Sequence, residues 1–330
     1  PRQQLTLADG SPVVPTEWEM SSILSSEFDT ADYQERYLVQ GVLVEGQPCI
    51  LGGPKKCLKT GLLIDLAMSL GTGTPFLGVF NVPERVPVLV LSGESGWYTL
   101  RETARRVAWS KGVRLADASV FWADRLPQIG NKEHLDALAQ CINNIGAKVV
   151  FIDPAYLCMM GGTSGKNAAN VFDMGSLLMG LADVGRSTGC TICLIHHARK
   201  ASGKDAGWQQ YGLPDLDDLS FSGFAEFARQ WILLNRRSAF AAGTGRHELW
   251  LSLGGSVGHC SSWALDVDEG LLGADFTGRI WQPVLTPAGS EIENRREEKA
   301  REKTLAKEDA IIANVEKIAR LLRETSEPMM

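Results

Sequence analysis

The chain has 330 residues, of which 44% are hydrophobic and 22% charged, and its formal net charge is −6. This length suits one large domain with appendages or two domains, and the composition suits a globular protein whose core forms without disulfides or metals. The negative charge argues against a surface permanently coated with nucleic acid, but it allows a short basic loop that contacts DNA inside an oligomer.

Cysteine usage and hydropathy bear on the cellular compartment. The seven cysteines are an odd number scattered through apolar runs, which favours reduced thiols over a disulfide framework. No run approaches about 18 apolar residues, and the N-terminus lacks the pattern of a signal peptide. We therefore expect a cytoplasmic protein without a membrane span.

The first two thirds of the chain alternate between strands and helices. Residues 1–35 are polar and turn-rich, and they are predicted to form an N-terminal arm. The predicted strands that follow cover 48–51, 86–92, 120–122, 148–153 and 190–196. The predicted helices between them cover 59–70, 97–110, 132–145 and 170–186. Strands that are apolar on both faces and alternate with helices indicate an α/β fold, in which helices cover both faces of a mostly parallel sheet.

The pattern changes after residue 217. Closely spaced strands over 231–234, 248–252 and 262–266 indicate an antiparallel C-terminal extension of the sheet. A run of charges of both signs then predicts a solvated linker, followed by apolar residues at helical spacing. We expect a core domain over 36–288, and over 289–330 a charged linker with an amphipathic helix that begins a truncated C-terminal domain.

The segment GPKKCLKT follows a predicted strand and opens a predicted helix, which is the context of a Walker A phosphate loop. Backbone amides at a helix N-terminus bind phosphate, so this loop is predicted to hold ATP. Lys59 is expected to reach the β and γ phosphates, and the Thr60 hydroxyl to coordinate Mg²⁺. The residues predicted to contact ATP are Gly53, Pro54, Lys55, Lys56, Cys57, Leu58, Lys59 and Thr60.

Leu58 departs from the usual pattern G-x-x-x-x-G-K-[ST], because it stands where the second glycine is expected. Its side chain therefore has to turn away from the nucleotide. The alternative interpretation of the whole segment is a coincidental lysine-rich turn.

Two acidic residues end predicted parallel strands, where ligands of open sheets bind. Asp153 ends the strand over 148–153 and is predicted to hold Mg²⁺ through water, as a Walker B carboxylate does. Glu94 follows the strand over 86–92 and is predicted to orient the attacking water as a general base. Each carboxylate has a simpler interpretation, as a helix cap or a surface turn residue.

His196 and His197 end the strand over 190–196, at the same edge of the sheet. Because side chains alternate along a strand, one of them is expected to contact the γ-phosphate and the other to face away. The alternative interpretation for each of the two residues is a hydrogen-bonded histidine in the core.

Basic residues near the C-terminal strands suggest two further contacts. The loop over 199–217 carries Arg199 with further lysines and aromatic side chains, so it can contact single-stranded DNA, or else be an ordinary surface loop. Arg229, Arg236 and Arg237 flank the strand over 230–235, and one of them can reach a neighbouring subunit's γ-phosphate. We expect this role for Arg229 or Arg236, with surface cations as the alternative.

These motifs together resemble the RepA-like branch of RecA-type AAA family ATPases. The residues that carry the resemblance are GGPKKCLKT, LSGES, VVFIDP, LIHHARK and SFSGFAEFARQWILLNRR, within residues 36–255. Plasmid RepA helicases and primase-linked ATPases of phages and mobile elements belong to this branch. The resemblance implies a RecA-like ATPase domain, ATP and Mg²⁺ as cofactors, single-stranded DNA as a partner, and a homo-oligomer, as a hexameric ring with its sites at subunit interfaces.

Three functions fit this interpretation. The first is a DNA helicase or translocase acting in the replication of a chromosome, plasmid or mobile element. The second is a nucleotide-dependent switch or loader that hydrolyses ATP slowly and unwinds nothing, which the acidic charge and Leu58 favour. The third is a phosphotransferase, which would need a second substrate pocket and lid arginines.

Overall fold

The computed structural model describes residues 22–159, 171–199, 210–220, 223–275 and 277–325. The chain divides into two compact units, Pro1–Glu35 and Arg36–Met330. In the first unit the described residues, 22–35, hold one short helix, α1 (Ser25–Thr30), with no buried residue. The rest of the predicted arm, 1–21, lies outside the described residues.

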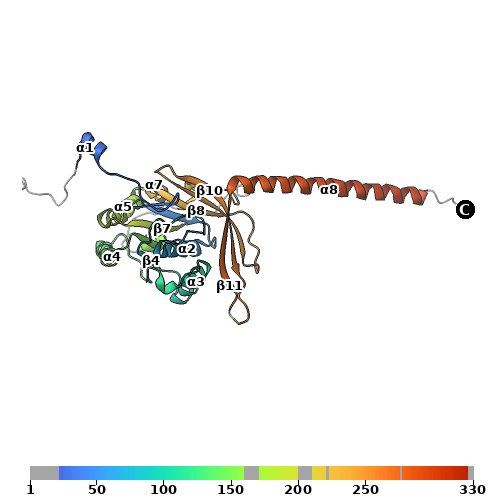
Figure 1. Cartoon of the computed structure of the whole chain (residues 1–330). Helices are drawn as coiled ribbons and strands as arrows, with labels where there is room; N and C mark the ends of the chain where they lie inside the picture. The colour runs from blue at the N-terminus through green and yellow to red at the C-terminus, as the bar shows by residue number, and fades with distance from the viewer. Residues whose placement is uncertain (1–21, 160–170, 200–209, 221–222, 276, 326–330) are drawn as a thin grey trace, which may run out of the picture. The chain divides into compact units, whose positions relative to one another are not determined.

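The second unit is built on a nine-stranded sheet (Figure 1) with the strand order β11-β10-β9-β8-β3-β7-β6-β4-β5. Six neighbouring strands are parallel: β3 (Cys49–Gly53), β4 (Val88–Ser92), β5 (Val120–Ala123), β6 (Val149–Asp153), β7 (Thr191–His197) and β8 (Gln230–Arg236). Three antiparallel strands extend the sheet beyond β8: β9 (Arg246–Gly255), β10 (Cys260–Gly270) and β11 (Arg279–Pro287). The predicted α/β fold with an antiparallel extension is thus confirmed.

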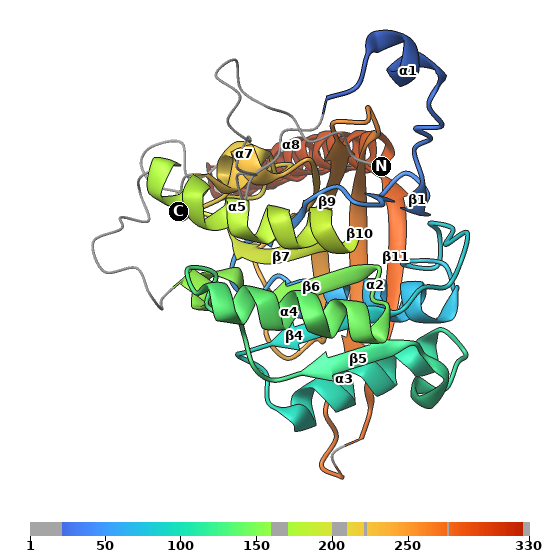
Figure 2. The same ribbon diagram turned by 90° about the vertical axis from the view of Figure 1, so that its left-hand side faces the viewer.

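The central strands are apolar on both faces because helices cover both. In β6, Phe151 packs into one core cluster and Ile152 into the other, as the alternation of side chains along a strand requires. Helices α2 (Lys59–Thr72) and α3 (Trp97–Ser110) contribute to the first cluster. Helices α4 (Lys132–Ile145), α5 (Val171–Thr188) and α7 (Phe224–Phe227) contribute to the second, and α4 and α5 lie side by side (Figure 2).

Short elements complete the second unit. A two-stranded sheet of β1 (Tyr37–Val39) and β2 (Leu43–Val44) precedes β3. Within the described residues, three short 3-10 helices join larger elements: η1 (Leu115–Asp117), η2 (Ala155–Met159) and η3 (Leu216–Asp218).

The strand β11, which the sequence analysis did not predict, ties the antiparallel extension to the helix that follows the phosphate loop. Trp281 of β11 is buried and donates a hydrogen bond through its indole nitrogen to the Asp65 carboxylate on α2, at 2.7 Å. Asp65 is also paired with Lys111, at 2.8 Å, and both side chains are buried. The antiparallel extension of the sheet is therefore attached to α2 through a buried polar network in which Asp65 is the shared acceptor.

The charged segment predicted as a linker is helical. It forms the first part of one helix, α8 (Ala288–Thr325), which also contains the predicted amphipathic segment. Glu, Arg and Lys are good helix formers, and opposite charges four residues apart, such as Glu291 and Arg295 at 2.7 Å, support a solvated helix. The apolar residues Ile311, Val315 and Ile318 are exposed on it.

Candidate functional site

The phosphate loop joins β3 to α2 at the carboxyl edge of the parallel strands. Gly53 ends β3, and a Cβ there would lie 2.7 Å from the Leu234 carbonyl oxygen, so only glycine fits. Leu58 adopts the left-handed conformation (φ 57°, ψ 24°) directly before the helix, and its side chain packs against the apolar core. That orientation leaves the concave side of the loop to the backbone, as the sequence analysis required of a leucine at this position.

The remaining loop residues differ in exposure. Lys55 and Lys56 are exposed and Pro54 is half-buried, whereas Cys57 is fully buried. Burial raises the pKa of the Cys57 thiol, and Arg236 opposes this shift. Cys57 is therefore a neutral core residue that anchors the loop.

Lys59 lies buried at the start of α2 with its ammonium folded over the loop. Its Nζ donates hydrogen bonds to the carbonyl oxygens of Gly53, at 2.9 Å, and Pro54, at 2.7 Å. Burial lowers the pKa of Lys59, while Asp153 and Glu94 are among the groups that raise it. The Lys59 ammonium is thus held by neutral carbonyl oxygens, and an anion such as a phosphate would stabilise its charge more strongly.

Thr60 and Asp153 meet beneath the loop. The Thr60 hydroxyl donates to Asp153 Oδ2 at 2.8 Å, across 93 residues of sequence. Burial raises the pKa of Asp153 to about 6; the Thr60 hydrogen bond and Lys59 oppose this shift, and Glu94 adds to it. The Thr60 hydrogen bond and Lys59 thus offset only part of the cost of burying the Asp153 carboxylate, and a bound cation would offset more of it. In the described part of the chain, no group of three or more His, Cys, Asp or Glu side chains converges on a metal position by itself.

Glu94 is exposed at the end of β4 and is held by a residue that the sequence analysis missed. The Tyr156 hydroxyl, in η2, donates a short hydrogen bond to Glu94 Oε1. This bond raises the pKa of Tyr156. The only feature of the sequence that draws attention to Tyr156 is its position three residues after Asp153, and this position is not enough to assign a role.

Ser92 is a second residue that the sequence analysis missed. It ends β4 in register with Asp153 on β6. Its hydroxyl is buried and has no hydrogen-bond partner among the residues that the structure describes. A buried hydroxyl of this kind can accept or donate a bond to a bound molecule at the same edge.

The two histidines lie on opposite sides of β7. The His196 ring stacks on Phe224, with centroids 3.8 Å apart, and its Nε2 lies 2.7 Å from the Ser220 carbonyl oxygen. Burial lowers the pKa of His196 to about 4, so the ring is neutral. His197 is half-buried, and its ring lies 5.9 Å from that of Tyr156. This placement favours the core interpretation for His196 and brings only His197 to the side of Glu94.

The three arginines have separate environments. Arg229 lies at the start of β8, where its backbone nitrogen donates to the Pro48 carbonyl oxygen. Five residues of parallel strand, about 16 Å, separate that level from Gly53. Arg236 lies at the other end of β8, and its Nη2 donates to the Lys56 carbonyl oxygen at 3.1 Å. The structure thus brings Arg236, and not Arg229, to this chain's own loop.

Arg237 is buried and structural. Its guanidinium pairs with Asp266 on β10 and Glu291 on α8, and it lies 5.6 Å from the Trp250 ring centroid. Arg295 pairs with the same Glu291. These contacts fasten the start of α8 to the antiparallel strands.

The loop predicted to contact DNA is described only in part. Lys200, Lys204 and Trp208 lie outside the described residues. Arg199 donates to the Asp217 carbonyl oxygen, and the Tyr211 carbonyl oxygen accepts from the Trp250 indole at 2.8 Å. Arg199 and Tyr211 thus form hydrogen bonds within the chain itself.

Comparison with known proteins agrees with this geometry. A family profile described as an AAA domain matches residues 15–203, which contain the phosphate loop, Glu94, Asp153 and both histidines. No curated protein matches the chain. A KaiC-like protein from the archaeon Pyrococcus horikoshii OT3 is 17% identical, with 76% of this chain and 94% of that chain covered and a TM-score of 0.45. A DnaB-like replicative helicase, solved to study its interactions with primase, is 10% identical, with 78% and 66% covered and a TM-score of 0.52.

The sheet and the loop have the RecA-like P-loop fold that the resemblance of the sequence implied. Because the profile matches more than half of its residues, the chain belongs to the AAA domain family. At 10% identity, the likeness to the helicase shows a shared fold. In the part of the chain that the structure describes, no helix has the length and hydrophobicity to cross a membrane.

Proposed function

We propose that this protein hydrolyses Mg-ATP and uses the energy to move along or unwind DNA. The observation that carries the proposal is the 2.8 Å contact between Thr60 and Asp153, directly beneath the loop on which Lys59 folds back. A hydroxyl, a carboxylate and an ammonium at one helix N-terminus are the groups that phosphoryl transfer from ATP requires.

The residues present fit a magnesium ion. Thr60 and Asp153 would hold it, the hydroxyl directly and the carboxylate through water, and Ser92 would accept or donate a bond to such a water. The ion would neutralise charge that develops on the phosphates during transfer. Proton binding at Asp153 competes with it, because the pKa of this carboxyl is about 6.

Glu94 is proposed to accept the proton of the attacking water. Tyr156 holds one of its carboxylate oxygens, so the other remains directed at the water. His197 is proposed as the γ-phosphate sensor, because its buried Nδ1 has no partner among the described residues. Charge on a bound phosphate would favour the protonated ring, whose pKa is now lowered by burial and by Lys59.

Arg236 is proposed to act on its own subunit. The guanidinium holds the Lys56 carbonyl oxygen at the apex of the loop. Leu58 stands where a glycine is usual and takes a left-handed conformation, which costs about 1–2 kcal/mol for a residue with a side chain. The hydrogen bond from Arg236 to the Lys56 carbonyl oxygen offsets part of this strain in the loop. An arginine finger that acts across a subunit interface is the alternative role for Arg236 or Arg229.

The DNA partner is proposed from the fold, which the chain shares with a structure described as a DnaB-like replicative helicase that is 10% identical to it. The ring is proposed from the resemblance of the sequence motifs alone. We expect single-stranded DNA to stimulate ATP hydrolysis at low salt, and Lys59→Ala to abolish hydrolysis. A wild-type protein that binds no adenine nucleotide would refute the ATPase, and a rate unchanged by DNA would refute the motor.

A slowly hydrolysing switch or loader is the second candidate. One observation favours it: the left-handed conformation of Leu58 in the loop. It predicts tight ATP binding, fewer than about one turnover per second, at the low end of typical enzyme rates, and no strand separation. The rate of ATP hydrolysis in the presence of single-stranded DNA distinguishes the two functions. Rapid turnover indicates the motor, and slow turnover indicates the switch.

A further inference from the structure

Helix α3 presents a stripe in which two basic side chains lie between two aromatic ones. Trp97, Arg101, Arg105 and Trp109 are spaced four residues apart, so they follow one another along one side of the helix. All four are exposed, with 52% of Trp97 and 72% of Trp109 accessible to solvent. At 1.5 Å per residue the stripe is about 18 Å long.

The charge of this stripe is not neutralised by any ion pair among the described residues. Neither Arg101 nor Arg105 forms an ion pair with any residue that the structure describes, whereas the next arginine, Arg106, is paired with Glu102 and Glu269. Two unpaired guanidinium groups between indole rings attract a ligand that is both anionic and aromatic.

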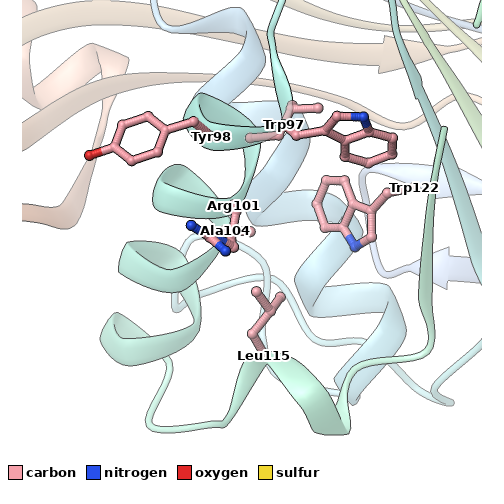
Figure 3. A pocket seen from close by; sticks show the side chains of 7 residues that line it. Trp97, Tyr98, Arg101, Ala104, Leu115 and Trp122 are labelled. Atoms are coloured by element: carbon pink, nitrogen blue, oxygen red, sulfur yellow. The ribbon is translucent and has the colours of Figure 1, made fainter. Parts of the chain in front are cut away.

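A cavity opens at one end of the stripe. It has a volume of about 350 Å³ and lies between α3, η1 and the edge strand β5. Figure 3 shows Trp97 and Trp122 at one side of it, with Arg101 one helical turn along from Trp97 and Leu115 at the far end. The Trp97 indole nitrogen donates to Asp124 at 3.1 Å, which fixes one edge of the ring. A volume near the lower end of small-ligand pockets suits one planar ring.

The cavity is separate from the phosphate site. β4 and β5 lie three and four strands from β3 in the sheet, which is about 14 and 19 Å at the usual strand spacing. The cavity beside β5 therefore does not serve the triphosphate of a nucleotide bound at Lys59.

We propose that this surface of α3 binds single-stranded DNA, with a base inserted beside Trp97 and Trp122 and the backbone phosphates on Arg101 and Arg105. Single-strand binding combines aromatic platforms for bases with cations that follow the backbone, and α3 supplies both, with its two arginines between its two tryptophans. This inference deepens the proposed function, since it assigns the contact for the DNA partner to α3.

The first test is the binding of a fluorescein-labelled oligo(dT) to the full chain, followed by anisotropy at low salt. Trp97→Ala should weaken binding about tenfold, in the range found when one stacking side chain is lost. The double variant Arg101→Gln/Arg105→Gln should reduce the slope of log K against log salt concentration by about 1.4, because two phosphate contacts are lost.

A matched control is Lys132→Gln on α4. This lysine is exposed and paired with Asp136, and it lies on the opposite side of the sheet from the stripe. It should change neither the dissociation constant nor the salt slope. Arg101, Arg105 and Lys132 are exposed, so the melting temperatures of these variants should match that of the wild type. Trp97→Phe, which keeps a stacking ring, should retain most of the binding.

Two results would overturn the inference. The first is a set of variants that bind oligo(dT) as the wild type does, which would leave the stripe to a protein partner. The second is a wild type that does not bind oligo(dT). ATP hydrolysis measured in the same preparations separates these results from a failure of the proposed function, because a chain without hydrolysis refutes the ATPase whatever the oligonucleotide does.

Discussion

Replacing Asp153 with asparagine should stabilise the protein while it removes the proposed activity. The pKa of this buried carboxyl is about 6, above the ordinary value of 3.8. An acid with a raised pKa in the folded state stabilises that state only when protonated, so its contribution is present below pH 3.8 and is lost as the pH rises through 6. About 2 pK units at 1.36 kcal/mol each give a cost of about 3 kcal/mol at pH 8.

The same relation fixes the pH dependence of the effect. At pH 5 the folded carboxyl is largely protonated, and the cost falls to roughly 1.6 kcal/mol. The stability advantage of Asp153→Asn over the wild type should therefore grow by about 1.4 kcal/mol between pH 5 and pH 8. Taking the difference cancels the titration of His196, whose pKa of about 4 applies to both proteins.

Urea denaturation of both proteins at the two pH values, with EDTA and without nucleotide, measures this difference. Asparagine can still accept the hydrogen bond from Thr60, so the contact itself is kept. An advantage that is absent at pH 8, or that is the same at both pH values, would show that burial does not raise the pKa of Asp153 and would weaken its assignment to a cation.

Three further predictions concern residues around the loop. Asp65→Ala should lower the free energy of unfolding by about 3–5 kcal/mol, because it leaves the buried Lys111 ammonium unpaired. Replacing both with apolar residues should recover only part of this loss in the same urea titration, because the Trp281 indole still loses its acceptor. Tyr156→Phe should reduce kcat about tenfold with little change in nucleotide affinity, because the general base loses its fixed orientation; an unchanged pH–rate profile with unchanged kcat would contradict this. Arg236→Ala should weaken nucleotide binding about tenfold, and mixing it with Lys59→Ala should restore no activity; recovery on mixing would instead indicate an arginine finger that acts across an interface.

The parts of the site that could be predicted are those encoded locally. The phosphate loop, Lys59 and Thr60 form one continuous segment between a strand and a helix, so their proximity follows from the sequence. The placement of Asp153 follows from the rule that the carboxyl ends of parallel strands meet at one edge. Its contact with Thr60 has the expected form, although its role with a metal ion stays a prediction.

Features that depend on tertiary packing could not be predicted. The hydrogen bond from Tyr156 to Glu94 joins two turns that are 62 residues apart, and no spacing rule relates them. Which histidine faces the core depended on the register of β7 against its neighbours, which alternation alone leaves open. The contact of Arg236 with the Lys56 carbonyl oxygen could not be predicted, because it depends on the pairing of β8 with β3. Its role as an arginine finger for a neighbouring subunit stays a prediction.

The end of β8 carries two consecutive arginines with very different attachments. Arg236 holds the apex of the phosphate loop, and Arg237 holds the root of a 38-residue helix through Glu291. Such a helix is about 57 Å long, so turning its root by roughly 5° would sweep its far end through about 5 Å. An ångström-scale adjustment at the nucleotide would in this way become a displacement as large as one helical turn at a distant point of the molecule.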